Sequence, residues 1–195
     1  EIFYPRPALV PSPPTTGKSG KVRLVTHHWS QNWNKGFEYF KQLSNYIDQF
    51  PEFELTFIGR ELPADQHPPN MRRIGPLFGD ELGEELSKHH IYITASKAEA
   101  CPNHVLEGMS TMLPLLYHVD IGGGVEISKP NGAESFSSFE DLITKIHIII
   151  NNYRDYQKLI NIPRLSSKLC CMKYQQTIET TYLRPSASDQ PTLSM

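Results

Sequence analysis

The sequence lacks long apolar runs and has few cysteines. Its 195 residues contain nothing near the ~18 consecutive apolar residues of a membrane-spanning helix, and the longest apolar run, positions 146–150, includes His147. The three cysteines, Cys101, Cys170 and Cys171, are odd in number and two are adjacent, so they form no disulfide framework. A reducing compartment is therefore expected. With no signal peptide in view, the sequence predicts a cytoplasmic protein.

Neither sign of charge predominates in the sequence. The formal net charge is −2, so electrostatics give no reason to expect a nucleic-acid partner. No Asp-x-Asp motif appears, and no metal or other cofactor is expected. The chain starts at Glu1 rather than at methionine, which suggests a fragment of a longer protein.

Strand and helix signals alternate along most of the chain. Strands are expected at positions 22–27, 53–58, 71–74, 91–94 and 114–119, and helices at 35–49, 80–89, 103–112, 138–151, 153–160 and 165–183. This alternation predicts an α/β fold, a Rossmann-like parallel sheet of five or six strands with helices on both faces. Residues 1–20 read as a linker or loop, 21–183 as the domain, and 184–195 as a flexible tail.

Glu99 and Glu107 are the most informative residues. Glu99 lies between the expected strand 91–94 and the helix that follows, whereas Glu107 lies within that helix. Pro102 suits a first helical turn and Asn103 is a good capping residue, so free backbone N–H groups are expected beside both acids. Two glutamates here could also simply face solvent and complement the helix dipole. Alternatively, the arrangement could hold a diphosphate at the carboxyl ends of the strands.

Lys35 and Gly36 form a second candidate site, after the first strand and at the start of the first helix. A lysine there can reach a phosphate as a point charge, and a glycine allows close approach of the backbone. The alternative is an ordinary solvated lysine, which the helix dipole would mildly disfavour.

These motifs together resemble the C-terminal, nucleotide-sugar-binding domain of retaining GT-B glycosyltransferases, in particular group 1, family GT4. The resemblance rests on the E-x7-E run from Glu99 to Met109 and on Lys35-Gly36. It is looser at Gly122-Gly-Gly-Val-Glu126, where the family often has G-G-x-x-E.

The resemblance implies roles for individual residues. Glu99 would lie by the donor sugar as the catalytic acid residue, and Glu107 would bind the ribose hydroxyls. Lys35-Gly36 would contact the donor diphosphate. The backbone amides near Asn103, His104 and Val105 would meet the donor phosphate or sugar.

The sequence departs from the family at one phosphate contact. Many members carry an arginine several residues ahead of the lysine, where this chain offers His28, Trp29 and Ser30. His28 and Trp29 are therefore taken as donor-binding candidates, with histidine a weak donor at neutral pH. Pro76 falls where family loops line the nucleotide base pocket.

The implied function is the donor-binding half of a retaining glycosyltransferase of hexosyltransferase type. Its partners would be a nucleotide-diphosphate sugar, a sugar or glycoconjugate acceptor, and a missing N-terminal GT-B domain that allows peripheral membrane contact. Without that domain the fragment is expected to be inactive. The alternatives are a non-catalytic nucleotide-sugar-binding module and an unrelated Rossmann-like domain, such as an epimerase half.

Three other motifs carry no site. Gly17-Lys18-Ser19 resembles the end of a P-loop but lacks the first glycine and the preceding strand. Adjacent histidines on a strand point to opposite faces, so the pairs at 27–28 and 89–90 cannot chelate one metal. Cys170 and Cys171 lie in an expected helix and are predicted to be buried.

Overall fold

The computed structural model of the chain describes residues 3–9, 11–14, 20–30, 32–60, 67–100, 102–123, 131–161 and 167–182. The chain divides into two compact units, residues 2–165 and a C-terminal unit that begins at Ser166. Within the second unit the structure describes helix α8 (Ser167–Tyr182). All the motifs identified from the sequence lie in the first unit, except the Cys170-Cys171 pair.

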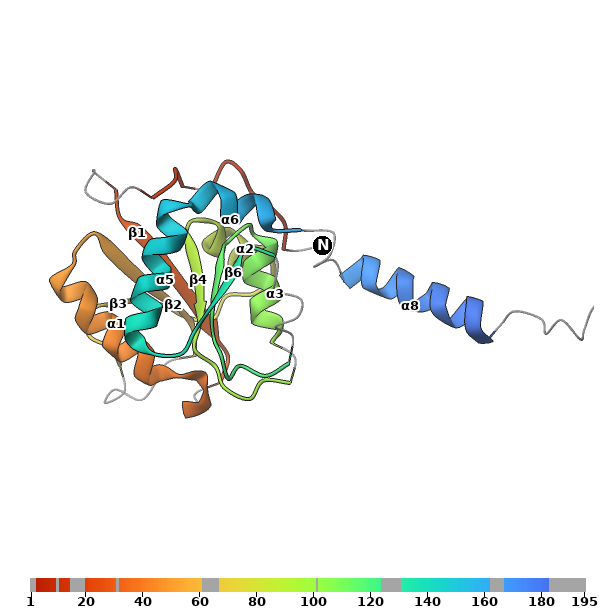
Figure 1. Cartoon of the computed structure of the whole chain (residues 1–195), viewed down its shortest axis with the longest axis horizontal. Coiled ribbons are helices and arrows are strands. Elements are labelled where there is room, and N and C mark those ends of the chain that lie inside the picture. Colours follow the sequence, from red (N-terminus) through yellow and green to blue (C-terminus); the bar gives the residue numbers. More distant parts are fainter. Residues whose placement is uncertain are drawn as a thin grey trace, which may run out of the picture. The chain divides into compact units, whose positions relative to one another are not determined.

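The first unit is built on a six-stranded sheet (Figure 1). Its strands are β1 (Val22–His28), β2 (Phe53–Gly59), β3 (Met71–Ile74), β4 (Ile91–Thr94), β5 (Leu115–His118) and β6 (Ala133–Phe136). They lie in the order β3-β2-β1-β4-β5-β6, and every neighbouring pair is parallel. The predicted parallel α/β sheet is confirmed.

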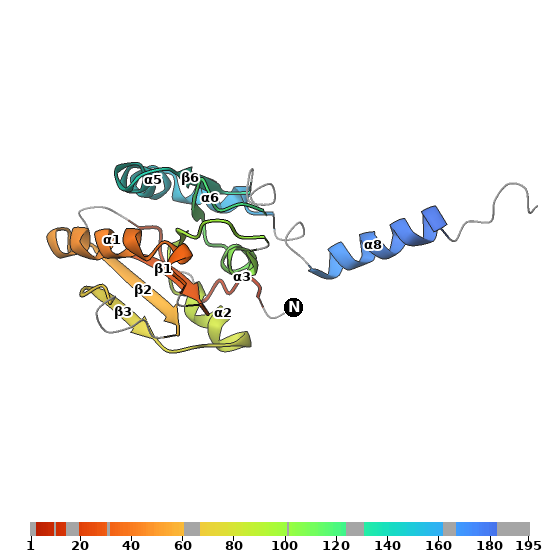
Figure 2. The same cartoon turned by 90° about the horizontal axis from the view of Figure 1, so that it is seen from below.

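Helices cover both faces of this sheet (Figure 2). They are α1 (Phe37–Gln49), α2 (Gly79–Ser87), α3 (Asn103–Ser110), α5 (Phe139–Asn151) and α6 (Tyr153–Leu159). Helices α1 and α5 pack against one face, and α2 and α3 pack against the other. The fold is therefore three-layered, as βαβ crossovers require of a parallel sheet.

The hydrophobic pattern explains why these segments form these elements. Strands β4 and β5 are buried at every position, as expected for strands covered on both faces. Helix α1 buries Phe37, Phe40, Leu43 and Ile47, which recur at helical spacing on one face. The Ser138 hydroxyl accepts a hydrogen bond from the Asp141 N–H (3.2 Å) and caps α5.

One strand differs from the sequence-based expectation. Strand β6 was not predicted, because Ala133-Glu-Ser-Phe136 has neither alternation nor a run of apolar residues. The segment before β1, predicted as a linker or loop, contains no helix or strand in residues 3–9 and 11–14, yet it packs on the domain. Arg6 is 8% exposed and donates to Asp80 (2.9 Å), and the Ser12 carbonyl accepts from His90 (3.0 Å).

The order of the strands locates the site. From β1 the chain moves outward to β2 and β3, then returns to the other side of β1 with β4 and continues to β5 and β6. The carboxyl ends of β1 and β4 therefore flank the point where the order reverses, where open α/β sheets bind ligands. No described helix is long and apolar enough to cross a membrane.

Two phenylalanines near helix α1 give a test of this packing. Phe40 is fully buried between α1 and the sheet, whereas Phe50, just after the helix, is 39% exposed. We expect Phe40→Ala to lower the free energy of unfolding by about 3–5 kcal/mol, because it leaves a cavity in the core. The matched Phe50→Ala variant loses mainly its stacking on Tyr46 and should cost about 1 kcal/mol. Urea unfolding measures both, and equal losses would contradict the described core.

Candidate functional site

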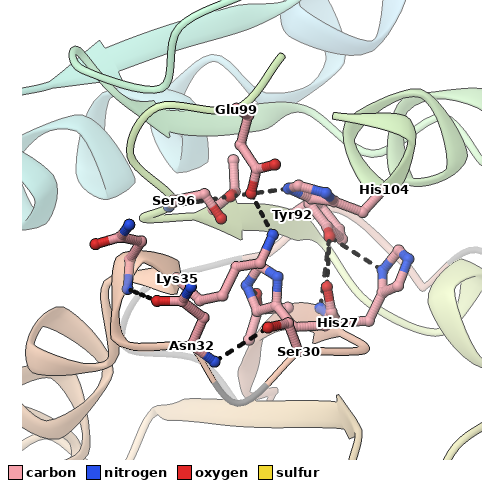
Figure 3. Close-up of polar contacts among 12 residues, drawn as sticks. His27, Ser30, Asn32, Lys35, Tyr92, Ser96, Glu99 and His104 are labelled. Atoms are coloured by element: carbon pink, nitrogen blue, oxygen red, sulfur yellow. Dashed lines mark hydrogen bonds and ion pairs between the residues drawn. The ribbon is translucent and has the colours of Figure 1, made fainter. Parts of the chain in front are cut away.

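The site lies where the loops after β1 and β4 meet (Figure 3). Lys35 ends a short 3-10 helix (Trp33–Lys35) that follows β1, and Glu99 lies on the loop that follows β4. The Lys35 ammonium group donates to Glu99 Oε1, and both side chains are largely buried. Two predicted site residues that are far apart in the sequence thus form an ion pair.

Close backbone packing fixes the two loops against each other. Gly36 has a left-handed backbone (φ 72°), and a Cβ there would lie 2.2 Å from the Ala95 carbonyl oxygen. The Lys97 N–H donates to the Asn34 carbonyl (2.8 Å) across the same junction. The predicted close approach at Gly36 is thus, in this structure, an approach to the β4–α3 loop itself.

A second pair of glycines holds the backbone of Glu99. Gly122 forms a parallel bridge with Glu99, and the Gly123 N–H donates to the Glu99 carbonyl (2.8 Å). A Cβ on Gly122 would lie 2.6 Å from that carbonyl, and Gly122 also has a left-handed backbone. The first two glycines of the G-G-x-x-E motif therefore hold the backbone of Glu99 in place. Residues 124–126 lie outside the described residues.

Helix α3 begins at Asn103 as expected, but its N-cap is the residue before. Pro102 is its N-cap and Asn103 its first helical residue, with no side-chain cap hydrogen bond, so the prediction that Asn103 caps the helix is wrong. The Val105 N–H donates to the Pro102 carbonyl (2.9 Å), which closes the first turn there. The Val105 side chain is buried and its N–H is used in this turn, so a ligand that contacts the Val105 amide would have to share or replace that bond. The start of α3 nevertheless follows the Glu99 loop directly, as predicted.

Glu107 lies one turn into α3 and already has a partner. Its Oε2 is 2.7 Å from His27 Nε2, and the His27 ring is buried to 1% exposure. His27 Nδ1 is in turn 3.0 Å from the hydroxyl of Tyr92, on β4. Glu107 itself remains 27% exposed, so its carboxylate is accessible from solvent.

Two of the three histidines of the site, His28 and His104, carry no charge near neutral pH. Burial, with repulsion from His27 and Lys35, lowers the pKa of the His104 imidazole to about 3. Burial, with repulsion from His104, His27 and Lys35, also lowers the pKa of His28 well below its ordinary value. His104 Nε2 contacts the Thr94 hydroxyl (3.1 Å), and His28 Nε2 contacts the Thr26 hydroxyl (3.1 Å). His28 therefore provides no positive charge in place of an arginine.

Trp29 and Pro76, two other predicted donor-binding residues, lie near the exposed ring of Phe78. Trp29 stacks on Phe78, with ring centroids 4.7 Å apart, and Phe78 is 69% exposed. Pro76 is exposed on the loop between β3 and α2, two residues before Phe78. A small pocket opens nearby, at the carboxyl ends of β2 and β3; it is lined by Phe57, Gly59, His67, Met71, Arg73, Ile74 and Gly75.

Sequence reasoning missed four polar residues of the site: His27, Tyr92, Thr94 and Ser96. His27 was examined only as half of a histidine pair. The prediction that this pair cannot chelate holds, since His27 faces Glu107 while His28 packs beside Phe37 and Phe40. The four missed residues all lie on β1 or β4 or directly after them, and this position can be recognised in the sequence.

The structure describes some of the motifs to which the sequence assigns no site. Gly17-Lys18-Ser19 lies outside the described residues. No group of three or more histidine, cysteine or acidic residues in the described ranges is arranged to hold a metal ion. Cys171 is exposed on α8, so the prediction that it is buried is wrong. Helix α8 has no strong apolar face that would have indicated burial.

No family model and no curated protein matches the sequence. Solved structures do resemble this one. The pneumococcal O-GlcNAc transferase GtfA, solved with UDP and GlcNAc, has a TM-score of 0.63 at 16% identity over 88% of this chain and 38% of its own. The C-terminal domain of the group 1 glycosyltransferase LpcC from Francisella tularensis gives 0.62 at 16% identity, over 89% and 96%. A glycosyltransferase from Rickettsia africae gives 0.64 at 17%, over 84% and 48%.

These similarities establish the fold. The six-stranded parallel sheet with its helices is the Rossmann-like architecture of the domains in these GT-B glycosyltransferases. The chain spans 38% of the length of GtfA but 96% of the isolated LpcC domain. The match is therefore to one domain of such proteins.

The lowered pKa of His104 predicts loss of stability in acid. The unfolded chain binds a proton at this histidine near pH 6.5, but the folded chain binds it only near pH 3. Stability should therefore fall as pH decreases from about 6.5, by up to about 1.4 kcal/mol per pH unit from this group. We expect the unfolding free energy of His104→Gln, measured in urea between pH 7 and pH 5, to fall less steeply than that of the unchanged chain.

The control for this experiment is Thr94→Val. It removes the hydroxyl that contacts His104 but leaves the titrating group in place. We expect it to lower stability at every pH without flattening the slope. A His104→Gln variant as acid-sensitive as the unchanged chain would show that another group causes the loss.

Proposed function

We propose that this chain is the donor-binding half of a retaining glycosyltransferase. In this proposal it binds a nucleotide-diphosphate sugar at the carboxyl ends of β1 and β4, and the sugar passes to a sugar or glycoconjugate acceptor held by another domain. The transfer is of the hexosyl type. Turnover then requires that other domain, because much of the rate enhancement in such reactions comes from positioning the two substrates.

One observation carries the proposal. Lys35 forms an ion pair with Glu99, and Glu107 on α3 contacts His27 at the end of β1, so these side chains, which come from two separate segments of the chain, lie on the elements around the point where the strand order reverses. An unrelated Rossmann-like domain has no reason to place these side chains together there. The solved structures with the same fold are glycosyltransferases, and one of them was solved with UDP and a sugar. This supports the proposed donor.

The chemistry of the residues suits such a donor. The diphosphate carries negative charge that grows as the sugar leaves, and Lys35 with the N-terminus of α3 can stabilise it. The Glu107 carboxylate can accept hydrogen bonds from both ribose hydroxyls. Lys35 is paired with Glu99, so in this proposal the diphosphate gives the ammonium group a second anionic partner. His28, Trp29, Gly36, Pro76 and the amides of Asn103, His104 and Val105 complete the proposed donor site.

The alternative is a module that binds a nucleotide-sugar without catalysis. The neutral His28 in place of the expected arginine favours it, since the phosphate contact is weaker. Both the catalytic and the non-catalytic proposal predict donor binding, and they differ in whether the full-length protein transfers the sugar. If the chain were instead an epimerase-like domain, its nucleotide binding would not depend on Glu107.

Calorimetric titration with UDP and with GDP tests the proposal directly. We expect one of them to bind the chain, and Glu107→Ala to weaken that binding by roughly tenfold or more, the value of a hydrogen bond to a charged group. Glu84→Ala, an exposed glutamate on α2, is the matched control and should bind like the unchanged chain. No binding of either nucleotide, or binding insensitive to Glu107, would refute the proposed donor site.

A second measurement separates phosphate from nucleoside contacts. We expect Lys35→Ala to weaken binding of the nucleoside diphosphate by about tenfold and to leave binding of the nucleoside nearly unchanged, because the ammonium group meets phosphate only. The matched control is Lys145→Ala, which breaks a part-buried ion pair with Glu134 (3.0 Å) outside the site. Equal losses for nucleotide and nucleoside would rule out this role for Lys35.

A further inference from the structure

We propose that His27 is a positioning residue: it holds the Glu107 carboxylate in the orientation that binds ribose, and Tyr92 holds His27. This inference rests on the proposed donor site but concerns residues to which no role has been given. It begins from two hydrogen bonds, one that joins Glu107 to His27 and one that joins His27 to Tyr92; Figure 3 shows the second.

The first contact fixes where the proton lies. An ionised carboxylate can only accept hydrogen bonds, so His27 must carry a hydrogen on Nε2 to make its 2.7 Å contact with Glu107 Oε2. The imidazole is 1% exposed, and it comes from β1 rather than from the helix that carries Glu107. The orientation of Glu107 is therefore set by a buried group on the sheet and not by helix α3 alone.

The second contact fixes the imidazole itself. The Tyr92 hydroxyl lies 3.0 Å from His27 Nδ1 and 3.4 Å from the His27 carbonyl oxygen; donation to the nearer Nδ1 leaves the ring hydrogen on Nε2, where Glu107 needs it. Tyr92 is fully buried, and burial raises the pKa of its hydroxyl well above the ordinary value, so it keeps its proton. The backbone N–H of His27 also donates to the Tyr92 hydroxyl oxygen (3.4 Å).

The residue after Glu107 makes room for this arrangement. Gly108 lies over the Tyr92 ring, and a Cβ at Gly108 would lie 2.7 Å from ring atoms Cγ and Cδ2. Only glycine lets α3 pack this closely on Tyr92. The Glu107-Gly108 pair therefore combines the proposed ribose contact with the space needed for the tyrosine that supports it.

The consequence for binding is pre-organisation. A glutamate side chain that is free to rotate loses this freedom when it binds a ligand, which weakens the binding. Glu107 is already held at Oε2 while its side chain remains 27% exposed, so Oε1 and the remaining lone pairs can accept from a ribose. His27 should thus strengthen the ribose contact without touching the ligand.

The test compares a ribonucleotide with its 2′,3′-dideoxy analogue, which lacks both hydroxyls that Glu107 would bind, by calorimetry, using UDP and ddUDP or GDP and ddGDP. We expect the unchanged chain to prefer the ribonucleotide by roughly tenfold. His27→Ala should reduce this preference severalfold while binding of the dideoxynucleotide stays the same. His27→Gln, whose amide N–H can still donate to Glu107, should restore the preference. Tyr92→Phe should reduce it partly.

The matched control is His90→Ala, which removes a buried, hydrogen-bonded histidine at the opposite ends of the strands. It should lower stability yet keep the ribose preference. A His27→Ala chain that loses affinity equally for both nucleotides, or a His27→Gln chain that shows no rescue, would overturn the positioning role while leaving the donor site intact. Failure of the unchanged chain to bind any nucleotide would instead overturn the proposed function and this inference with it.

Discussion

The contact between the β1–α1 loop and the β4–α3 loop is the constraint on which the site depends. Gly36 packs directly on Ala95, at a distance that no side chain would permit. This brings the Lys35 ammonium group to the Glu99 carboxylate and sets both beside the start of α3. The reversed strand order makes the contact possible, since it places β4 next to β1 in the sheet.

The charged side chains of the site are paired with one another or with a histidine. Lys35 is paired with Glu99, and Glu107 is hydrogen-bonded to His27. The nearby His28 and His104 stay neutral, because burial and neighbouring positive charges disfavour their protonation. In the proposed donor site, the positive charge that a diphosphate would meet therefore comes from the Lys35 ammonium group and the N-terminus of α3 and not from these histidines.

Much of the fold could be predicted from the sequence. Strands β1 to β5 and the helices that cover them have the apolar runs and helical spacing that the structure confirms, as the buried face of α1 shows. Strand β6 could not be predicted, because a short polar segment becomes a strand only by hydrogen-bonding to β5. The N-cap of α3 was misplaced by one residue for a similar reason, since the turn at Pro102 depends on local backbone bonds.

For the site, the sequence by itself determined which residue types are present and at which strand ends: Lys35 after β1, and Glu99 and Glu107 after β4. Only the tertiary structure decided their partners. His27 meets Glu107 across 80 residues and Tyr92 across 65, and Gly108 matters because of a ring on another element. Spacing along a chain records periodicity within an element, whereas contacts between elements depend on how the sheet is ordered and how closely the helices pack on it.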